Sequence, residues 1–232
     1  MELLDVLRTT GAVRAFRPDP VPDDVLYRVL DNARFAPSGG NRQGWHLIVV
    51  RDPAVRAGLR DLYLPGWYEY LAERAAGLVP FAPITDEAAE ERALAQAQAI
   101  AQTAAQGQGG FAEHLDEVPV MLVLLADLRA LAAMDKNLPR YTLVGGASIY
   151  PFAWSILLAA REEGLAGVIT TMPIPREPAV KALLHVPDEF AVAALIVLGA
   201  PLKQPRKLTR NPVESFTAVD RFDGQPFVAP GA

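Results

Sequence analysis

Apolar residues recur at helical spacing near the start of the chain, and continuous apolar runs follow them. Residues 3–10 place leucines on one side of a short predicted helix. A second helix is predicted to open at Pro22, where two aspartates suit a first turn, and its apolar face extends to Ala33. The run 46–50 predicts a strand. Pro53 begins a further helix, which we expect to end near Tyr63.

The second half of the chain mixes strands and helices without regular alternation. Apolar runs predict a central strand from Val118 to Ala126 and another over 191–198, with a short strand or turn over 167–171. Helices are predicted over 143–162, ending near Gly164, and over 178–184. This irregular order favours an α+β fold over a doubly wound sheet.

Residues 64–117 differ from their surroundings. A predicted helix over 86–106 is rich in Ala, Gln and Glu, and the glycines of 107–110 interrupt the chain after it. Ala and Gln are good helix formers, which favours order over disorder here. We interpret 64–117 as a helical insertion packed over the core of a single domain spanning 1–232.

The segment from Leu143 to Ala160 is almost uncharged and approaches the length of a membrane span. It also contains two glycines and a proline, and arginines flank it. A helix buried on all sides in a large core is the better interpretation. The N-terminal leucines are interrupted by acidic residues, which is not typical of a signal peptide. By default we expect a cytoplasmic protein with no membrane partner.

Composition narrows the function classes. The 232 residues are 51% hydrophobic and 21% charged, with a net charge of −5, so a large core is possible and a general nucleic-acid partner is not expected. Cysteine is absent, which excludes disulfides and thiolate catalysis. The three histidines are not at metal-ligand spacing, and we expect no metal site. Residues 146–150 lack the last glycine of a nucleophile elbow, and 107–110 fit no nucleotide-binding fingerprint.

The strongest functional signal is the loop Ala36–Trp45, with the sequence APSGGNRQGW, which leads directly into the predicted strand. Small residues let backbone and short polar groups approach a flat ligand closely. Upstream, Arg14-Ala15-Phe16 precedes a proline-rich extended stretch, 17–22.

Four segments, in order, resemble the nitroreductase family of FMN-dependent oxidoreductases. They are 14–22, the loop 36–45, the stretch 146–171 with GASI, AAR, EGL and TT, and 198–214 with LGAP and RNPVE. The likeness spans nearly the whole chain. It implies an α-β-α sandwich around a mostly antiparallel sheet, an intertwined homodimer, and FMN bound at the dimer interface.

The resemblance also assigns candidate cofactor-binding residues. A dianionic phosphate needs charge-assisted donors, and Arg14 and Arg210 are the natural pair, with Lys207 a weaker candidate. The remaining candidates contact the ring by resemblance: Pro37, Ser38 and Gly39 as a small-residue wall, Asn41 and Gln43 as polar supports, and Thr170 and Thr171 through main-chain N–H groups. For each of these residues, an ordinary structural or surface role is the alternative.

The implied activity is hydride transfer from NADH or NADPH, through bound flavin, to an electron-poor acceptor such as a nitroaromatic, quinone or enone. No catalytic side chain is obvious, because the flavin carries the chemistry. Trp67, Tyr68 and Phe111, with Tyr70 and Phe81, lie in or beside the insertion and either line a substrate pocket or pack the insertion.

The chain also departs from the family pattern. The family usually has a basic residue and often a serine where Gly11 and Ala12 stand. We therefore expect a phosphate contact to be missing or supplied elsewhere, by Arg8 or Arg17. Other flavin chemistry, such as dehalogenation, azoline oxidation or flavin fragmentation, and a flavin-binding pseudoenzyme stay as alternatives.

Overall fold

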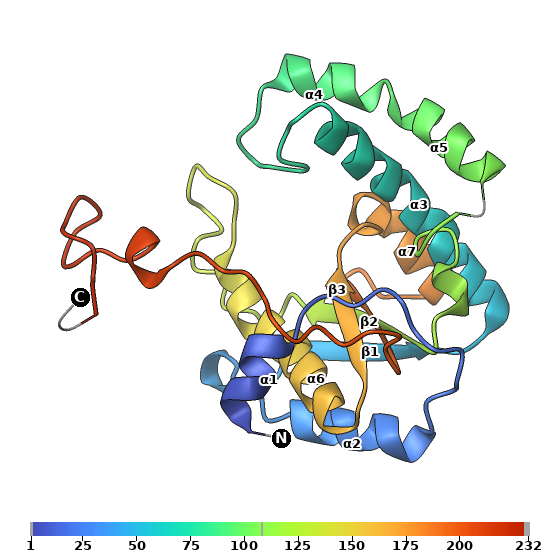
Figure 1. Cartoon of the computed structure of the whole chain (residues 1–232), viewed down its shortest axis with the longest axis horizontal. Helices are drawn as coiled ribbons and strands as arrows, with labels where there is room; N and C mark the ends of the chain where they lie inside the picture. The colour runs from blue at the N-terminus through green and yellow to red at the C-terminus, as the bar shows by residue number, and fades with distance from the viewer. Residues whose placement is uncertain (1, 108, 230–232) are drawn as a thin grey trace.

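The computed structural model describes residues 2–107 and 109–229, and its centre is a four-stranded sheet (Figure 1). The strands are β1 (Trp45–Val50), β2 (Val120–Asp127), β3 (Ala166–Thr170) and β4 (Phe190–Gly199). Their order is β1-β2-β4-β3, and every neighbouring pair is antiparallel. The sheet has helices on both faces, which confirms the predicted α+β sandwich.

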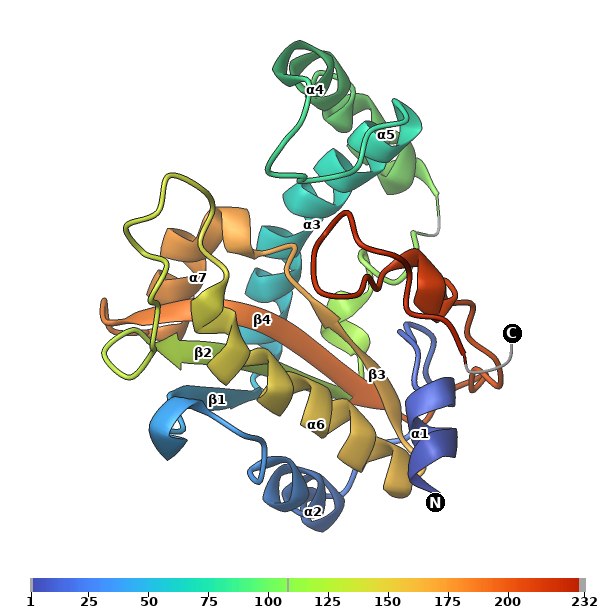
Figure 2. The ribbon, with the colours of Figure 1, turned by 90° about the vertical axis from the view of Figure 1, so that its left-hand side faces the viewer.

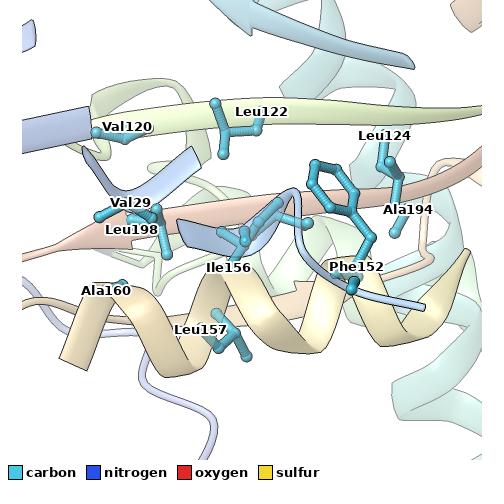
Figure 3. Close-up of a cluster of buried hydrophobic side chains, with 14 of the residues drawn as sticks. Val29, Val120, Leu122, Leu124, Phe152, Ile156, Leu157, Ala160, Ala194 and Leu198 are labelled. Atoms are coloured by element: carbon cyan, nitrogen blue, oxygen red, sulfur yellow. The ribbon is translucent and has the colours of Figure 1, made fainter. Parts of the chain in front are cut away.

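The two central strands are apolar on both faces because helices cover both. On one face lie α2 (Asp23–Ala33) and α6 (Tyr150–Glu162), and on the other lie α3 (Pro53–Ala75) and α7 (Glu177–Leu184) (Figure 2). Figure 3 shows the first core, in which α6 packs across β2 and β4. Its labelled side chains on α6 are Phe152, Ile156, Leu157 and Ala160, and those on the strands include Leu122, Leu124, Ala194 and Leu198.

The N-terminal segment after α1 (Leu3–Thr9) runs beside the outer end of β3 and β4. Val13 N–H donates to the carbonyl of Gly167 at 2.9 Å, and Arg17 N–H donates to the carbonyl of Ala200 at 2.8 Å. The chain that leaves β4 returns the contact, since Leu202 N–H donates to Ala15 at 3.0 Å. This pairing fixes residues 13–17 against the sheet.

Helix α3 is longer than predicted. It continues through Pro65 and Gly66 to Ala75, whereas the sequence indicated an end near Tyr63. Proline cannot donate the usual helical hydrogen bond, but packing along the rest of the helix outweighs that loss. The residues assigned to the insertion therefore begin inside α3. The predicted helix over 86–106 is two helices, α4 (Glu87–Leu94) and α5 (Ala97–Gln106), which pack on α3.

The predicted helix over 143–162 is also divided. Residues Val144–Ser148 form a 3-10 turn, and α6 begins only at Tyr150, with Pro151 in its first turn. The helix is not buried on all sides, because Tyr150 and Trp154 are 45% and 37% exposed. Among the described residues, no helix has the length and apolar character needed to cross a membrane.

Candidate functional site

The loop 36–44 is a compact turn anchored to the 3-10 turn that precedes α6. Gly39 N–H donates to Oγ of Ser148 at 3.0 Å, and Gln43 N–H donates to Oγ of Ser38 at 2.9 Å. The chain turns sharply here, since Gly40, Asn41 and Gln43 have left-handed φ values between 51° and 61°. The loop is thus held in one shape by its own polar groups.

The ends of this loop are buried and its middle is exposed. Ala36 and Gly44 are buried, and Trp45 stacks on Phe152 with ring centroids 4.6 Å apart. Between them the ring-binding candidates Pro37, Gly39, Asn41 and Gln43 are exposed and Ser38 is half-buried. Their surfaces are free to contact a ligand from outside the chain.

The end of β3 forms a second polar cluster. The hydroxyl of Tyr63 lies 3.2 Å from Oγ1 of Thr170, and both side chains are buried. Burial raises the pKa of Tyr63, while its hydrogen bond to Thr170 and the positive charge of Arg14 act in the opposite direction. Arg14 and Thr170, predicted from distant parts of the sequence, thus come to one place around Tyr63.

Arg14 faces an open cavity of about 300 Å³, which Phe16, Arg17, Phe111 and His114 also line. Its guanidinium makes no hydrogen bond or ion pair with any residue that the structure describes. Phe111 packs edge-on against Tyr63, with ring centroids 6.4 Å apart. An unpaired cation at the mouth of a cavity can receive an anionic group such as a phosphate.

One chain does not bring the loop and the Thr170 cluster together. Trp45 of β1 pairs with Ala126 of β2, which pairs with Ala191 of β4. Thr170 lies on β3, the opposite edge strand, and pairs with Leu195 of β4. Strand geometry then separates Trp45 from Thr170 by on the order of 20 Å. Figure 2 shows the turn before β1 and the N-terminal segment at opposite ends of the molecule.

Arg210, the second predicted phosphate ligand, lies in the extended C-terminal tail. It is exposed and donates to the carbonyl of Thr209 at 2.7 Å. No contact among the described residues joins it to Arg14. The tail instead places Leu208 over Gly11, where the family pattern has a basic residue.

The predicted substrate residues lie on or against α3. Trp67 stacks on Tyr70 with centroids 5.4 Å apart, and the Tyr68 hydroxyl donates to Glu113 at 3.1 Å. Burial, followed by Glu113, raises the pKa of Tyr68. These contacts are ones that packing of the insertion would also make, so a substrate role for Trp67, Tyr68 and Phe111 stays a prediction.

Beside Thr171 lies an apolar cavity of about 420 Å³. It brings Phe81 of the insertion and Tyr150 of α6 together with the segment after β3 and the first half of β4. The lining contains no charged side chain and consists of Phe81, Tyr150, Thr171, Ile174, Pro175, Val192 and Ala193. Sequence reasoning missed Tyr63 and Tyr150, because neither stands in a motif and only tertiary packing places them here.

Comparison with known proteins identifies the family. The model of the nitroreductase family matches residues 7–200. A protein of Thermus thermophilus named NADH dehydrogenase is 31% identical over 203 residues, which cover 88% of each chain. A 5,6-dimethylbenzimidazole synthase of Rhodobacter capsulatus is 29% identical over 86% of this chain and 83% of its own.

Solved structures share the fold. An iodotyrosine deiodinase bound to FMN and 3-iodo-L-tyrosine superposes with a TM-score of 0.65 at 20% identity, covering 95% of this chain and all of that one. The antiparallel sheet, on which the anchored loop and the Val13 pairing with β3 are placed, is therefore a shared scaffold. With a family model matched across most of its length, the chain belongs to the nitroreductase family.

Proposed function

We propose that the protein is an FMN-dependent oxidoreductase that takes hydride from NADH or NADPH and passes it to an electron-poor acceptor. Family membership supports a flavin oxidoreductase. The observation that carries the proposal furthest is the unpaired guanidinium of Arg14, which stands over a cavity beside the Tyr63–Thr170 pair. When bound, the flavin supplies the hydride chemistry.

The residues present fit such a cofactor. Arg14 is available for the phosphate, and the exposed Pro37, Ser38 and Gly39 offer a small-residue surface for a flat ring. The main-chain N–H group at Thr171 would stabilise negative charge on the reduced ring. Gly11 adds no phosphate contact, and Arg17 lines the same cavity as Arg14 and would be the second cation.

A homodimer would complete this site, since the loop and the Thr170 cluster are far apart in one chain. Two further observations support it. The C-terminal tail extends away from the body with exposed Phe216, Phe222 and Phe227 (Figure 1). Tyr150 and Trp154 expose one side of α6. Large apolar surfaces of this kind mark interfaces, and a second copy would place its loop opposite Thr170.

The acceptor would be small, planar and uncharged. The cavity beside Thr171 has apolar and aromatic walls, and burying a charge there would lack compensation. A nitroaromatic, quinone or enone meets this requirement. Product analysis separates this function from dehalogenation and from flavin fragmentation. The names of the related iodotyrosine deiodinase and 5,6-dimethylbenzimidazole synthase indicate, for those proteins, deiodination and synthesis of 5,6-dimethylbenzimidazole.

The test begins with the purified protein. Mass spectrometry of the released ligand should identify FMN, and anaerobic NADH or NADPH should bleach its visible absorption. A nitroaromatic or quinone should then restore the colour. Sedimentation equilibrium should give twice the chain mass. Protein that carries no flavin and takes up none would refute the proposal, and bound flavin that neither donor bleaches would favour a flavin-binding pseudoenzyme.

A further inference from the structure

Three residues of α3 contact the chain that leaves β3. Tyr63, Gly66 and Glu69 are spaced by three, so that they lie along one side of the helix. They meet Thr170, Met172 and Arg176, respectively, in the same order. The helix therefore contacts this segment at three points, between residues 63 and 69 of the helix and between residues 170 and 176 of the segment.

The first contact is buried on both sides. Tyr63 is 1% exposed and Thr170 is 6% exposed, so water does not satisfy either hydroxyl. Among the described residues, this 3.2 Å contact is the hydrogen bond that each of the two hydroxyl groups makes. Losing one partner would leave a buried polar group unpaired, which is the costly case for a hydrogen bond. Tyr63 thus fixes the last residue of β3.

The second contact joins main chain to main chain. A Cβ on Gly66 would lie 2.4 Å from the carbonyl oxygen of Met172, a distance that no side chain tolerates. Glycine at position 66 is what lets α3 approach the backbone immediately after Thr171. The close approach explains why a glycine is retained inside a long helix, where it costs about 1 kcal/mol in propensity.

The third contact is a two-point ion pair. Glu69 accepts hydrogen bonds from both terminal nitrogens of Arg176, at 3.0 and 2.6 Å. The two side chains are 24% and 31% exposed, which shields the pair in part. Glu69 raises the pKa of Arg176 beyond its ordinary value, which keeps the guanidinium charged. Paired bonds of this kind fix orientation as well as distance.

We propose that Tyr63 and Glu69 are positioning residues that, with Gly66, hold the 170–176 segment against α3 and so place the main-chain donor of Thr171 toward the flavin. This inference rests on the proposed function. Because α4 and α5 pack on the same helix, α3 also joins the insertion rigidly to this edge of the site.

Two pairs of variants test the inference. Tyr63→Phe removes one hydroxyl, and Tyr27→Phe removes an exposed hydroxyl on α2. Glu69→Gln weakens the ion pair with Arg176, and Glu163→Gln weakens another two-bond pair, which Arg28 makes through Nε and Nη2. For each we would measure the dissociation constant of FMN by fluorescence titration of the apo-protein, the midpoint potential of the bound flavin, and the melting temperature.

We expect Tyr63→Phe and Glu69→Gln each to raise the FMN dissociation constant about three- to tenfold and to make the midpoint potential more negative, since less well placed donors stabilise the reduced ring less. Both controls should match the wild type in potential and affinity. If the wild type binds FMN and all four variants keep its potential, this inference is wrong and the proposed function stands. If the wild type takes up no FMN, both are overturned. Should Tyr63→Phe fail to fold, Glu69→Gln decides the outcome alone.

Discussion

A Cβ on Gly11 would lie 2.9 Å from Cδ2 of Leu208, so the tail occupies the space that a side chain at position 11 would need. Gly11 does not have a positive φ, so the constraint on a side chain at position 11 is the space that Leu208 fills. An apolar side chain, Leu208, thus lies against the position where the family pattern has a basic residue.

This contact predicts coupling between Gly11 and Leu208. Gly11→Arg should destabilise the protein by about 1 kcal/mol, at the low end for overpacking because Leu208 can move its side chain. Leu208→Ala should remove most of that penalty in the double variant. Urea denaturation of the wild type, the two single variants and the double variant gives the interaction free energy. Strictly additive effects would show that the two sites do not share this space.

Arg14 and Arg210 are the predicted partners on the phosphate, and among the described residues no contact joins them. Arg14→Ala should weaken FMN binding about tenfold or more, the value of a charge-assisted hydrogen bond. Arg210→Ala should have a smaller effect. Neither should change the melting temperature much, because both side chains are exposed and no ion pair with them is found in the described part of the chain.

Fluorescence titration of the apo-protein checks this prediction. Arg74→Ala, which removes an exposed arginine in the last turn of α3, serves as the matched control. Equal affinity in Arg14→Ala and Arg74→Ala would rule out Arg14 as a phosphate ligand. A large effect of Arg210→Ala would indicate that the tail of a second copy supplies the other cation.

Local pattern predicted the elements of the core well. The continuous apolar runs of β2 and β4 are long, and both faces of these strands are covered by helices, so hydrophobicity alone locates them. The end of α3 was missed because Pro65 and Gly66 read as a terminus. At Gly66 the helix packs closely against the carbonyl of Met172, more than a hundred residues later. No local window of the sequence contains that contact.

The sequence indicates candidate site residues one by one but not their arrangement. Arg14 comes near Tyr63, the partner of Thr170, where Val13 pairs with Gly167, a contact between distant segments. The separation of Trp45 from Thr170 depends on the strand order β1-β2-β4-β3. Neither relationship leaves a periodic signal in the sequence, because each is set by how strands choose neighbours.

Ser148 should matter for the loop before β1, although it is not among the predicted site residues. Its Oγ accepts a hydrogen bond from the N–H of Gly39 at 3.0 Å, and the residue is 9% exposed. Ser148→Ala should lower the free energy of unfolding by about 1 kcal/mol and weaken FMN binding, since the loop loses its anchor. Ser215→Ala, which removes an exposed hydroxyl that donates to Pro212, is the control. If both variants bind FMN alike, the anchor has no part in the site.

Asp135 predicts a specific acid dependence of stability. The N–H of Leu143, together with Arg140 and the N–H of Val144, lowers the pKa of this carboxyl below its ordinary value of 3.8, against the opposing effect of burial. Its carboxylate thereby closes the loop between β2 and α6. A carboxyl with a lowered folded-state pKa stabilises the fold above the unfolded-state pKa, and this contribution is lost as pH falls through the folded-state value.

Asp135→Asn should therefore melt at a lower temperature than the wild type at pH 7, because the uncharged amide replaces an ionised acceptor. The difference should shrink as the pH falls below 3.8, where the carboxyl of the unfolded wild-type chain becomes protonated, and should vanish below the lowered folded-state pKa. Melting curves of both proteins between pH 7 and pH 3 measure it. Asp188→Asn, at a fully exposed carboxyl, should track the wild type throughout. A difference between Asp135→Asn and the wild type that stays constant down to pH 3 would mean that the ionised carboxylate does not stabilise this loop.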